Sequence, residues 1–220
     1  MEISFAGHSC FKVKGKTSSI VFDPYSSEIG YKLPKLEADV VCVSHNHFDH
    51  NFVEGVKGSD GSVPFVINAP GEYDLKGVYV RGFKSFHDDK EGKERGLNTI
   101  YYVEVDGIFM LHLGDLGHVL PDDIVSELEV VDVLFVPIGG IYTIGTEEVD
   151  EIISQLEPSI VVPMHFRTEK LLVPKASEMN PLEKFTNEWG SDGVKKVDKL
   201  KIFQKSDLPE ETQIVVIEQL

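Results

Sequence analysis

The chain contains little cysteine: its 220 residues include only Cys10 and Cys42. Two cysteines cannot build a disulfide framework, and these two are not arranged as a Cys-x-x-Cys pair. Each lies inside a strand-like stretch, so we expect both thiols to pack as small apolar groups. This cysteine usage favours a reduced, cytoplasmic protein.

Long apolar runs and an excess of basic charge are also missing. No stretch approaches the roughly 18 to 20 apolar residues that cross a bilayer, and residues 1–5 lack the basic start of a signal peptide. We therefore expect no membrane association. The 21 basic and 37 acidic residues leave a formal charge of −16. Such a surface repels phosphate backbones and argues against a nucleic-acid partner.

Two common catalytic signatures are absent from the sequence. There is no Gly-x-Ser-x-Gly nucleophile elbow and no Walker phosphate loop, which disfavours covalent serine catalysis and nucleotide hydrolysis of that type. The composition is that of an ordinary globular protein, with 41% hydrophobic and 26% charged residues. The length suits one compact domain, which we expect to span residues 1–220.

The first half of the chain has the pattern of β-strands and the second half alternates strands with helices. Residues 10–14 and 19–22 predict a hairpin, and the apolar run 39–43 predicts a strand buried on both faces. Helices are predicted over residues 121–128 and from an N-cap at Thr146 to a stop at Pro158. Further strands are predicted at 63–67, 78–83, 100–105, 108–113, 131–137, 159–163, 199–203 and 213–217. Two sheets covered by helices are expected.

The strongest functional signal is a histidine cluster, His45-Asn46-His47-Phe48-Asp49-His50. At this chain's own histidine and aspartate frequencies, a His-x-His-x-Asp-His match has a chance of about one in a thousand. The cluster follows a predicted buried strand, at the end where α/β sheets place their sites. Residues i and i+2 of an extended segment face the same way, so His45 and His47 can chelate one ion. Asp49 and His50 can then hold a second ion.

Four more polar residues follow predicted strands. Asp23 comes after 20–22, His87 after 83–86, Asp115 after 111–114, and His165 after 161–164. Any one of them alone is typical of a turn. Together, around a metal motif, they indicate one site. Imidazole and carboxylate ligands suit zinc, and manganese or iron accept them as well.

These motifs, in this order, resemble those of the metallo-β-lactamase superfamily over nearly the whole chain. Finer features resemble its ascorbate-6-phosphate lactonase-like branch: Gly7-His8-Ser9-Cys10, residues 137–145, and Pro163-Met164-His165. The resemblance implies an αββα sandwich, with two mixed β-sheets flanked by helices. It also implies a site for two divalent ions, most suitably Zn²⁺, with Mn²⁺ or Fe²⁺ as alternatives.

The resemblance assigns roles to the candidate residues. His45, His47 and His87 would hold one ion, and Asp49, His50 and His165 the other. Asp115 would bridge the two ions, and Asp23 would orient a histidine without binding metal. His112 and His118 compete with His87 as ligands, although the position of His112 inside a strand favours core packing.

Other residues are weaker candidates. Besides Asp49, His118 is a candidate catalytic group for substrate contact or proton transfer. His8, Arg95 and Tyr142 are candidate substrate-binding residues. The glycine-rich, charged stretch 88–96 follows His87 directly and is a candidate lid.

The site predicts a hydrolase. Two ions about 3.5 to 4 Å apart can share a hydroxide that attacks a carbonyl or phosphoryl centre. The leading hypothesis is a metal-dependent hydrolase of a small ester, lactone or phosphoester. The alternatives are a phosphodiesterase or nuclease and a metal-stabilised binding protein without turnover. A small-molecule substrate is expected, and a homo-oligomer is compatible with the sequence.

Overall fold

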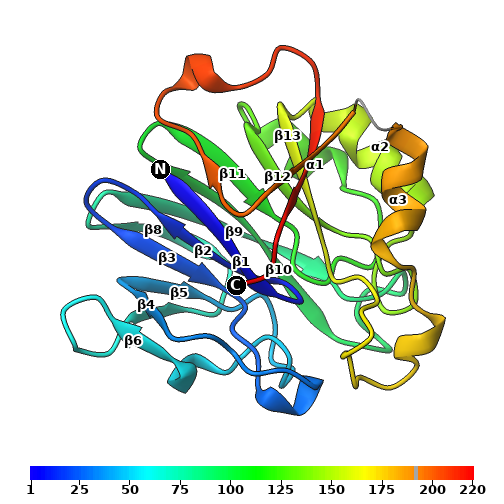
Figure 1. The fold of residues 1–220 in the computed structure, drawn as a ribbon, viewed down its shortest axis with the longest axis horizontal. Coiled ribbons are helices and arrows are strands. Elements are labelled where there is room, and N and C mark those ends of the chain that lie inside the picture. The colour runs from blue at the N-terminus through cyan, green and yellow to red at the C-terminus, as the bar shows by residue number, and fades with distance from the viewer. Residues whose placement is uncertain (191–192) are drawn as a thin grey trace.

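Two β-sheets form the centre of the computed structural model, which describes residues 1–190 and 193–220 (Figure 1). The smaller sheet has the strand order β15 (Leu200–Lys201), β1 (Glu2–Gly7), β2 (Cys10–Lys14), β3 (Ser19–Phe22), β5 (Val40–Cys42) and β7 (Phe65–Ile67). The larger sheet has the order β14 (Val194–Val197), β16 (Gln213–Ile217), β13 (Ile160–Met164), β12 (Val133–Pro137), β11 (Ile108–His112), β10 (Leu97–Val105), β9 (Val78–Phe86) and β8 (Gly71–Leu75). A small third sheet pairs β4 (Leu36–Ala38) with β6 (Val56–Gly58).

Both large sheets are mixed. In the smaller one, β1, β2 and β3 pair antiparallel, whereas β3, β5 and β7 are parallel. In the larger one, β8 to β11 form an antiparallel meander, and β11, β12, β13 and β16 are parallel. The predicted hairpin of β2 and β3 is confirmed, with Phe11 opposite Phe22. The parallel strands bring their carboxyl ends to a common edge, where the candidate residues follow them.

The main core lies between the two sheets. Alternate side chains of each sheet point inward, and large aromatic residues meet at the centre, with the ring centroids of Phe11 and Phe135 separated by 4.5 Å. Cys10 and Cys42 are fully buried and free, as expected for small apolar groups. This packing holds the two sheets in fixed positions relative to each other, and the site at their edge depends on that.

Helices cover the outer face of the larger sheet. They are α1 (Asp122–Glu127), α2 (Thr146–Leu156) and α3 (Leu182–Trp189), seen on the right in Figure 1. Val149 and Ile152 of α2, at helical spacing, and Phe185 of α3 belong to the hydrophobic cluster on this face of the sheet. The predicted start of α2 is off by one residue, because Gly145 is the N-cap and its N–H donates to the Glu148 carboxylate.

The fold class is confirmed, but the two outer faces differ. In the described part of the chain, no α-helix covers the smaller sheet. Its outer face is covered instead by β4 and β6, by segment 171–179, and by the single 3₁₀ turns η1 (Ser27–Ile29) and η2 (Val53–Gly55). The remaining 3₁₀ turns are η3 (Ala176–Glu178) and η4 (Lys205–Asp207). Within residues 1–190 and 193–220, no helix has the length and apolar character needed to cross a membrane.

Candidate metal centre

The candidate metal ligands and Asp23 lie in segments that directly follow strands. Asp23 follows β3, the His45–His50 cluster follows β5, His87 follows β9, Asp115 follows β11, and His165 follows β13. Three residues of the site have left-handed backbone, with φ of 56° at His8, 42° at Asp23 and 51° at His165. Non-glycine residues rarely adopt this conformation, and it costs about 1 kcal/mol or more. Such strain is typical of sites whose side chains must point in a set direction.

Asp23 organises the histidine cluster from beneath. Its carboxylate is fully buried and accepts hydrogen bonds from the Ser44 N–H at 2.7 Å, the Ser44 hydroxyl at 2.7 Å and His50 Nδ1 at 2.9 Å. His45 Nδ1 in turn donates to the Ser44 hydroxyl oxygen at 2.9 Å. Because Nδ1 of each ring is occupied, Nε2 of His45 and His50 is directed to the centre of the site, as in metal-binding histidines.

One group of candidate ligands consists of His45, His47 and His87. One potential ligand atom from each lies within 4.8 Å of the others. The ring centroid of His45 lies 4.5 Å from that of His47 and 4.7 Å from that of His87. His45 and His87 are buried, whereas His47 is exposed and lines the cleft above. The structure thus brings together the three residues that the resemblance assigns to one ion.

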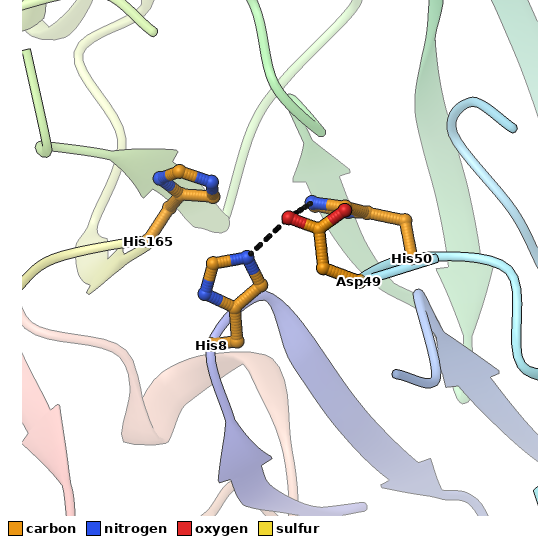
Figure 2. Close-up of side chains that lie close together, drawn as sticks. All are labelled: His8, Asp49, His50 and His165. Carbon is orange, nitrogen blue, oxygen red and sulfur yellow. Dashed lines mark hydrogen bonds and ion pairs between the residues drawn. The ribbon is translucent and has the colours of Figure 1, made fainter. Parts of the chain in front are cut away.

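A second group contains Asp49, His50, His165 and His8, again with ligand atoms within 4.8 Å of one another. Figure 2 shows their side chains converging from three separate segments of the chain. His8 Nε2 lies 3.3 Å from Asp49 Oδ2, and the rings of His8 and His165 are 4.2 Å apart between centroids. His8 is the member that the assigned ligand set did not include.

Asp115 lies between the two groups. Its Oδ2 is 4.0 Å from His45 Nε2 and 3.4 Å from His87 Nε2 on one side. On the other side it is 3.3 Å from His50 Nε2 and 3.1 Å from His165 Nε2. One buried carboxylate oxygen therefore faces an imidazole nitrogen from four different residues. This is the arrangement that a carboxylate bridging two cations requires.

The centre contains buried polar atoms without hydrogen-bond partners, and their chemistry fits that of metal ligands. His45 Nε2, His50 Nε2 and Asp115 Oδ1 are buried and have no hydrogen-bond partner within the described residues. Buried polar atoms without partners are rare in proteins, because each costs about 1 to 3 kcal/mol. Several such atoms in one centre, all of them imidazole or carboxylate, match the donor set of a divalent transition metal.

The electrostatics of the centre also favour a cation. Burial lowers the pKa of His45, because the charged ring would lose its hydration, and the neighbouring His50 adds repulsion. Burial opposes the charge of His50 as well, but the carboxylates of Asp115, Asp49 and Asp23 together raise its pKa. Burial acts to raise the pKa of Asp115, and His165 and His50 reverse this and lower it. The buried carboxylates of the centre thus stabilise positive charge on the imidazoles beside them. A bound metal ion can supply that positive charge in place of a proton.

Asn98 is a site residue that the sequence analysis missed. It is buried in β10, and its side-chain oxygen accepts a hydrogen bond from the Asp115 N–H at 3.0 Å. Its amide group donates to Ser85 Oγ and to the Leu113 carbonyl. Gly114 has a φ of 56°, and a Cβ there would lie 2.4 Å from the Asn98 side-chain oxygen. Asn98 and Gly114 together set the position of Asp115.

A cleft of about 500 Å³ opens above the centre. Besides the candidate ligands His47, Asp49, His87, Asp115 and His165, it is lined by Asn46, Phe48, Arg95, Tyr142, Val173 and Pro174. Arg95 and Tyr142, two of the predicted substrate-binding residues, lie in this wall. The third, His8, is not among the lining residues, and its side chain is fully buried behind Asp49.

His118 and His112 are held by backbone groups. His118 Nδ1 donates to the Val119 carbonyl at 2.8 Å, and Nε2 accepts from the Phe86 N–H at 3.2 Å. Both ring nitrogens are therefore engaged away from the cleft, which favours a structural role and gives no support to the predicted catalytic one. His112 is fully buried, stacks on Phe22 at 4.8 Å and donates to the Ser9 carbonyl, so its expected core packing is confirmed.

The loop over residues 88–96 is anchored by Asp88, a second residue that the sequence analysis missed. Its buried carboxylate accepts hydrogen bonds from the backbone N–H groups of Lys90, Gly92, Glu94 and Arg95, at 2.7 to 3.0 Å. This network ties the loop to the residue next to His87. The predicted lid is therefore a well-connected turn in the structure, and it presents Arg95 to the cleft.

Comparison with known proteins agrees with the geometry. The model of the β-lactamase superfamily domain matches residues 2–165, a range that contains every candidate ligand. The chain belongs to the metallo-β-lactamase superfamily. A Thermotoga maritima structure assigned to this superfamily is 35% identical, with a TM-score of 0.80, and the match covers 100% of this chain and 99% of that one.

Curated relatives are similar over most of the chain. A UPF0173 metal-dependent hydrolase from Natranaerobius thermophilus is 28% identical over 78% of this chain and 86% of its own length. One from Thermococcus onnurineus is 29% identical, over 76% and 85% respectively. Both relatives are named as metal-dependent hydrolases, and neither name supports the ascorbate-6-phosphate lactonase-like branch, which stays a prediction.

Proposed function

We propose that this metallo-β-lactamase superfamily protein is a metal-dependent hydrolase that holds two divalent ions and cleaves small esters, lactones or phosphoesters. The observation that carries the proposal is the position of Asp115, whose Oδ2 lies within 4.0 Å of four histidine Nε2 atoms on the floor of the cleft. The relatives named as metal-dependent hydrolases support it.

In this proposal, His45, His47 and His87 hold one ion, and Asp49, His50 and His165 the other, with Asp115 between them. The mixture of imidazole and carboxylate suits Zn²⁺, and Mn²⁺ or Fe²⁺ remain alternatives. When bound, the ions would supply an activated water and a Lewis acid for the oxyanion that develops at the substrate.

Asp49 is the catalytic residue of the proposal. It borders the cleft, and its carboxylate contacts His8 Nε2 at 3.3 Å and lies 3.8 Å from His50 Nε2. Burial acts to raise the pKa of Asp49, but these two histidines outweigh it and lower that pKa. Asp49 therefore stays ionised and accepts a hydrogen bond that orients the attacking water. His8 holds this carboxylate from behind, a positioning role in place of the predicted substrate contact.

The overall reaction for an ester adds one water. The water oxygen bonds to the acyl carbon, the bond from that carbon to the alcohol oxygen breaks, and the alcohol leaves with one of the water protons. The other proton is released from the new carboxylic acid. The walls of the cleft where this reaction takes place are apolar, and they exclude bulk water and bind the apolar part of a substrate. They are formed by Phe48, Val173, Pro174 and the ring of Tyr142.

The proposal is tested with purified protein loaded with Zn²⁺, Mn²⁺ or Fe²⁺ and offered p-nitrophenyl esters, an aromatic lactone and bis-p-nitrophenyl phosphate. We expect hydrolysis of an ester, lactone or phosphoester that a chelator abolishes and that the metal restores. Exclusive cleavage of nucleic-acid phosphodiesters would favour the nuclease alternative. Stoichiometric metal without turnover of any member of the panel would favour a binding protein.

Replacement of His118 by Ala distinguishes a structural role of this histidine from a catalytic one. The variant leaves the Phe86 N–H and the Val119 carbonyl without partners, so we expect the free energy of unfolding to fall by about 1 to 3 kcal/mol. The kcat/KM of the folded, metal-loaded enzyme should stay within about threefold of wild type. Urea denaturation and initial rates measure the two effects. A kcat reduced by about 100-fold or more, the size typical of a lost general acid or base, would restore the predicted catalytic role.

The partner class, the location, the domain organisation and the oligomeric state remain predictions. A small-molecule substrate fits the size of the cleft, and the formal charge of −16 still argues against nucleic acid. The cytoplasmic location agrees with two free, buried cysteines. A single domain over residues 1–220 and a homo-oligomer are compatible with the fold.

A further inference from the structure

Two hollows meet at the candidate metal centre. The cleft described above has apolar walls, and a second hollow of about 490 Å³ adjoins it. Asn46, His47 and Arg95 line both hollows, so the ligand His47 lies on their common border. The second hollow continues over β9 and β10, past Lys84 and Leu97, to the segment after β7 at Asn68. A substrate centred on the ions can therefore extend to either side.

The charge of the second hollow is opposite to that of the protein as a whole. In the cleft, the acidic residues are Asp49 and Asp115, and both belong to the metal group. No acidic residue lines the second hollow, whereas Lys84 and Arg95 both do. Within residues 1–190 and 193–220, neither cation takes part in an ion pair. In a chain of formal charge −16, two unpaired cations beside a reactive centre form a local attraction for anions.

Arg95 is held in place before any ligand binds. Its backbone N–H donates to the Asp88 carboxylate at 2.7 Å, and its guanidinium lies 5.7 Å from the centroid of the Tyr142 ring. Its Nη2 also donates to the Ile141 carbonyl at 3.4 Å. A guanidinium has five N–H donors, so four remain for a ligand, in a planar arrangement that suits two oxygens of a carboxylate or phosphate. Orientation in advance lowers the entropic cost of binding.

Lys84 supplies a second cation, from the side of the hollow that is formed by the β-sheet. It projects from β9, where it pairs in register with Thr99 of β10, and its Nζ lies 5.3 Å from the centroid of the Phe86 ring. Its ammonium is exposed and compact, a point charge that tolerates different oxyanion geometries.

We propose that the second hollow is an anion subsite, formed by Arg95 and Lys84, that selects substrates carrying a carboxylate or phosphate group several bonds away from the scissile bond. The apolar part of the same substrate occupies the cleft between Phe48 and Val173. The substrate class is thus an amphipathic, anionic ester, lactone or phosphoester. This inference rests on the proposed hydrolase function and narrows it.

The test compares two esters of equal acyl length, mono-p-nitrophenyl adipate and p-nitrophenyl hexanoate, with the ω-phosphonate analogue as a third. The metal-loaded wild type should have a kcat/KM for the two anionic esters about 10-fold or more above that for hexanoate. The ratio of adipate to phosphonate rates distinguishes a carboxylate from a phosphate preference. In Arg95→Gln and Lys84→Gln, the preference for anionic esters should fall about 10-fold or more towards unity, mainly through KM.

Lys90→Gln is the matched control. Lys90 is a cation of the same loop as Arg95, but it pairs with Glu94 and lines neither hollow. This variant should keep the wild-type preference. Arg95→Lys keeps the positive charge but lacks the planar donors, so it should retain part of the preference for anionic esters. Equal kcat/KM values for the three esters in wild type, or equal losses on all esters in Arg95→Gln, would overturn the subsite.

Calorimetry separates failure of the subsite from failure of the hydrolase. The metal-loaded protein is titrated with adipate and with hexanoate, which share one carboxylate and differ in the second. Tighter binding of adipate that disappears in Arg95→Gln supports the subsite even if no ester is cleaved. Hydrolysis of the esters without any difference between the two acids overturns the subsite and leaves the hydrolase proposal standing.

Discussion

Replacement of Asp115 by Ala is expected to remove both metal ions, whereas replacement of His47 by Ala removes about one. Asp115 Oδ2 faces histidines of both ligand groups, but His47 belongs to a single group. Wild type should carry about two ions per chain, and Asp115→Ala close to none. Activity in Asp115→Ala should fall by about 10³-fold or more, since the ions supply several kcal/mol of transition-state stabilisation.

Elemental analysis of purified protein measures this directly, with thermal unfolding as the check on folding. Asp115→Asn keeps the shape of the side chain and tests the same loss if the alanine variant is unstable. His47 is exposed, so His47→Ala should fold normally and serve as the one-site control. Metal content equal to wild type in both Asp115 variants would show that Asp115 bridges nothing.

Asp23→Asn should lower both stability and metal affinity. The amide nitrogen that replaces one carboxylate oxygen cannot accept a hydrogen bond, so His50 Nδ1 or a Ser44 donor loses its buried partner. We expect the free energy of unfolding to fall by about 3 kcal/mol or more, because a buried charged partner is lost. Metal affinity should fall about 10- to 100-fold, the effect typical of groups that orient a ligating histidine.

Asp132→Asn provides the control for stability alone. Asp132 is also buried and accepts the Phe109 N–H at 2.8 Å, but it stands before β12, at the opposite end of that strand from the site. This variant should lose stability and retain wild-type metal affinity. Denaturant unfolding and competition with a metal chelator measure the two quantities. A similar loss of metal affinity in both variants would show that Asp23 contributes to the stability of the fold and not specifically to the orientation of His50.

The hydrophobic pattern predicted two sheets covered by helices, and the resemblance of the motifs to the superfamily supplied the sandwich architecture and the expected role of each candidate ligand. Hydrophobic periodicity reports which residues are buried, and a strand buried on both faces, such as β5, has a recognisable apolar run. Polar residues that follow such runs must lie at a sheet edge, which is how Asp23, His87, Asp115 and His165 could be predicted as neighbours of the His45–His50 cluster.

The contacts of each side chain depend on the three-dimensional packing of the chain. His8 and Asp49 are 41 residues apart, and the Asp115 N–H meets Asn98 across 17 residues. No local pattern encodes such pairs, because they arise from the packing of two sheets and the paths of their loops. The same packing turns both nitrogens of His118 to the backbone and puts Arg95 and Lys84 on one hollow. Local sequence determines where a polar residue emerges, whereas the partners of its atoms depend on which distant segments the core brings beside it.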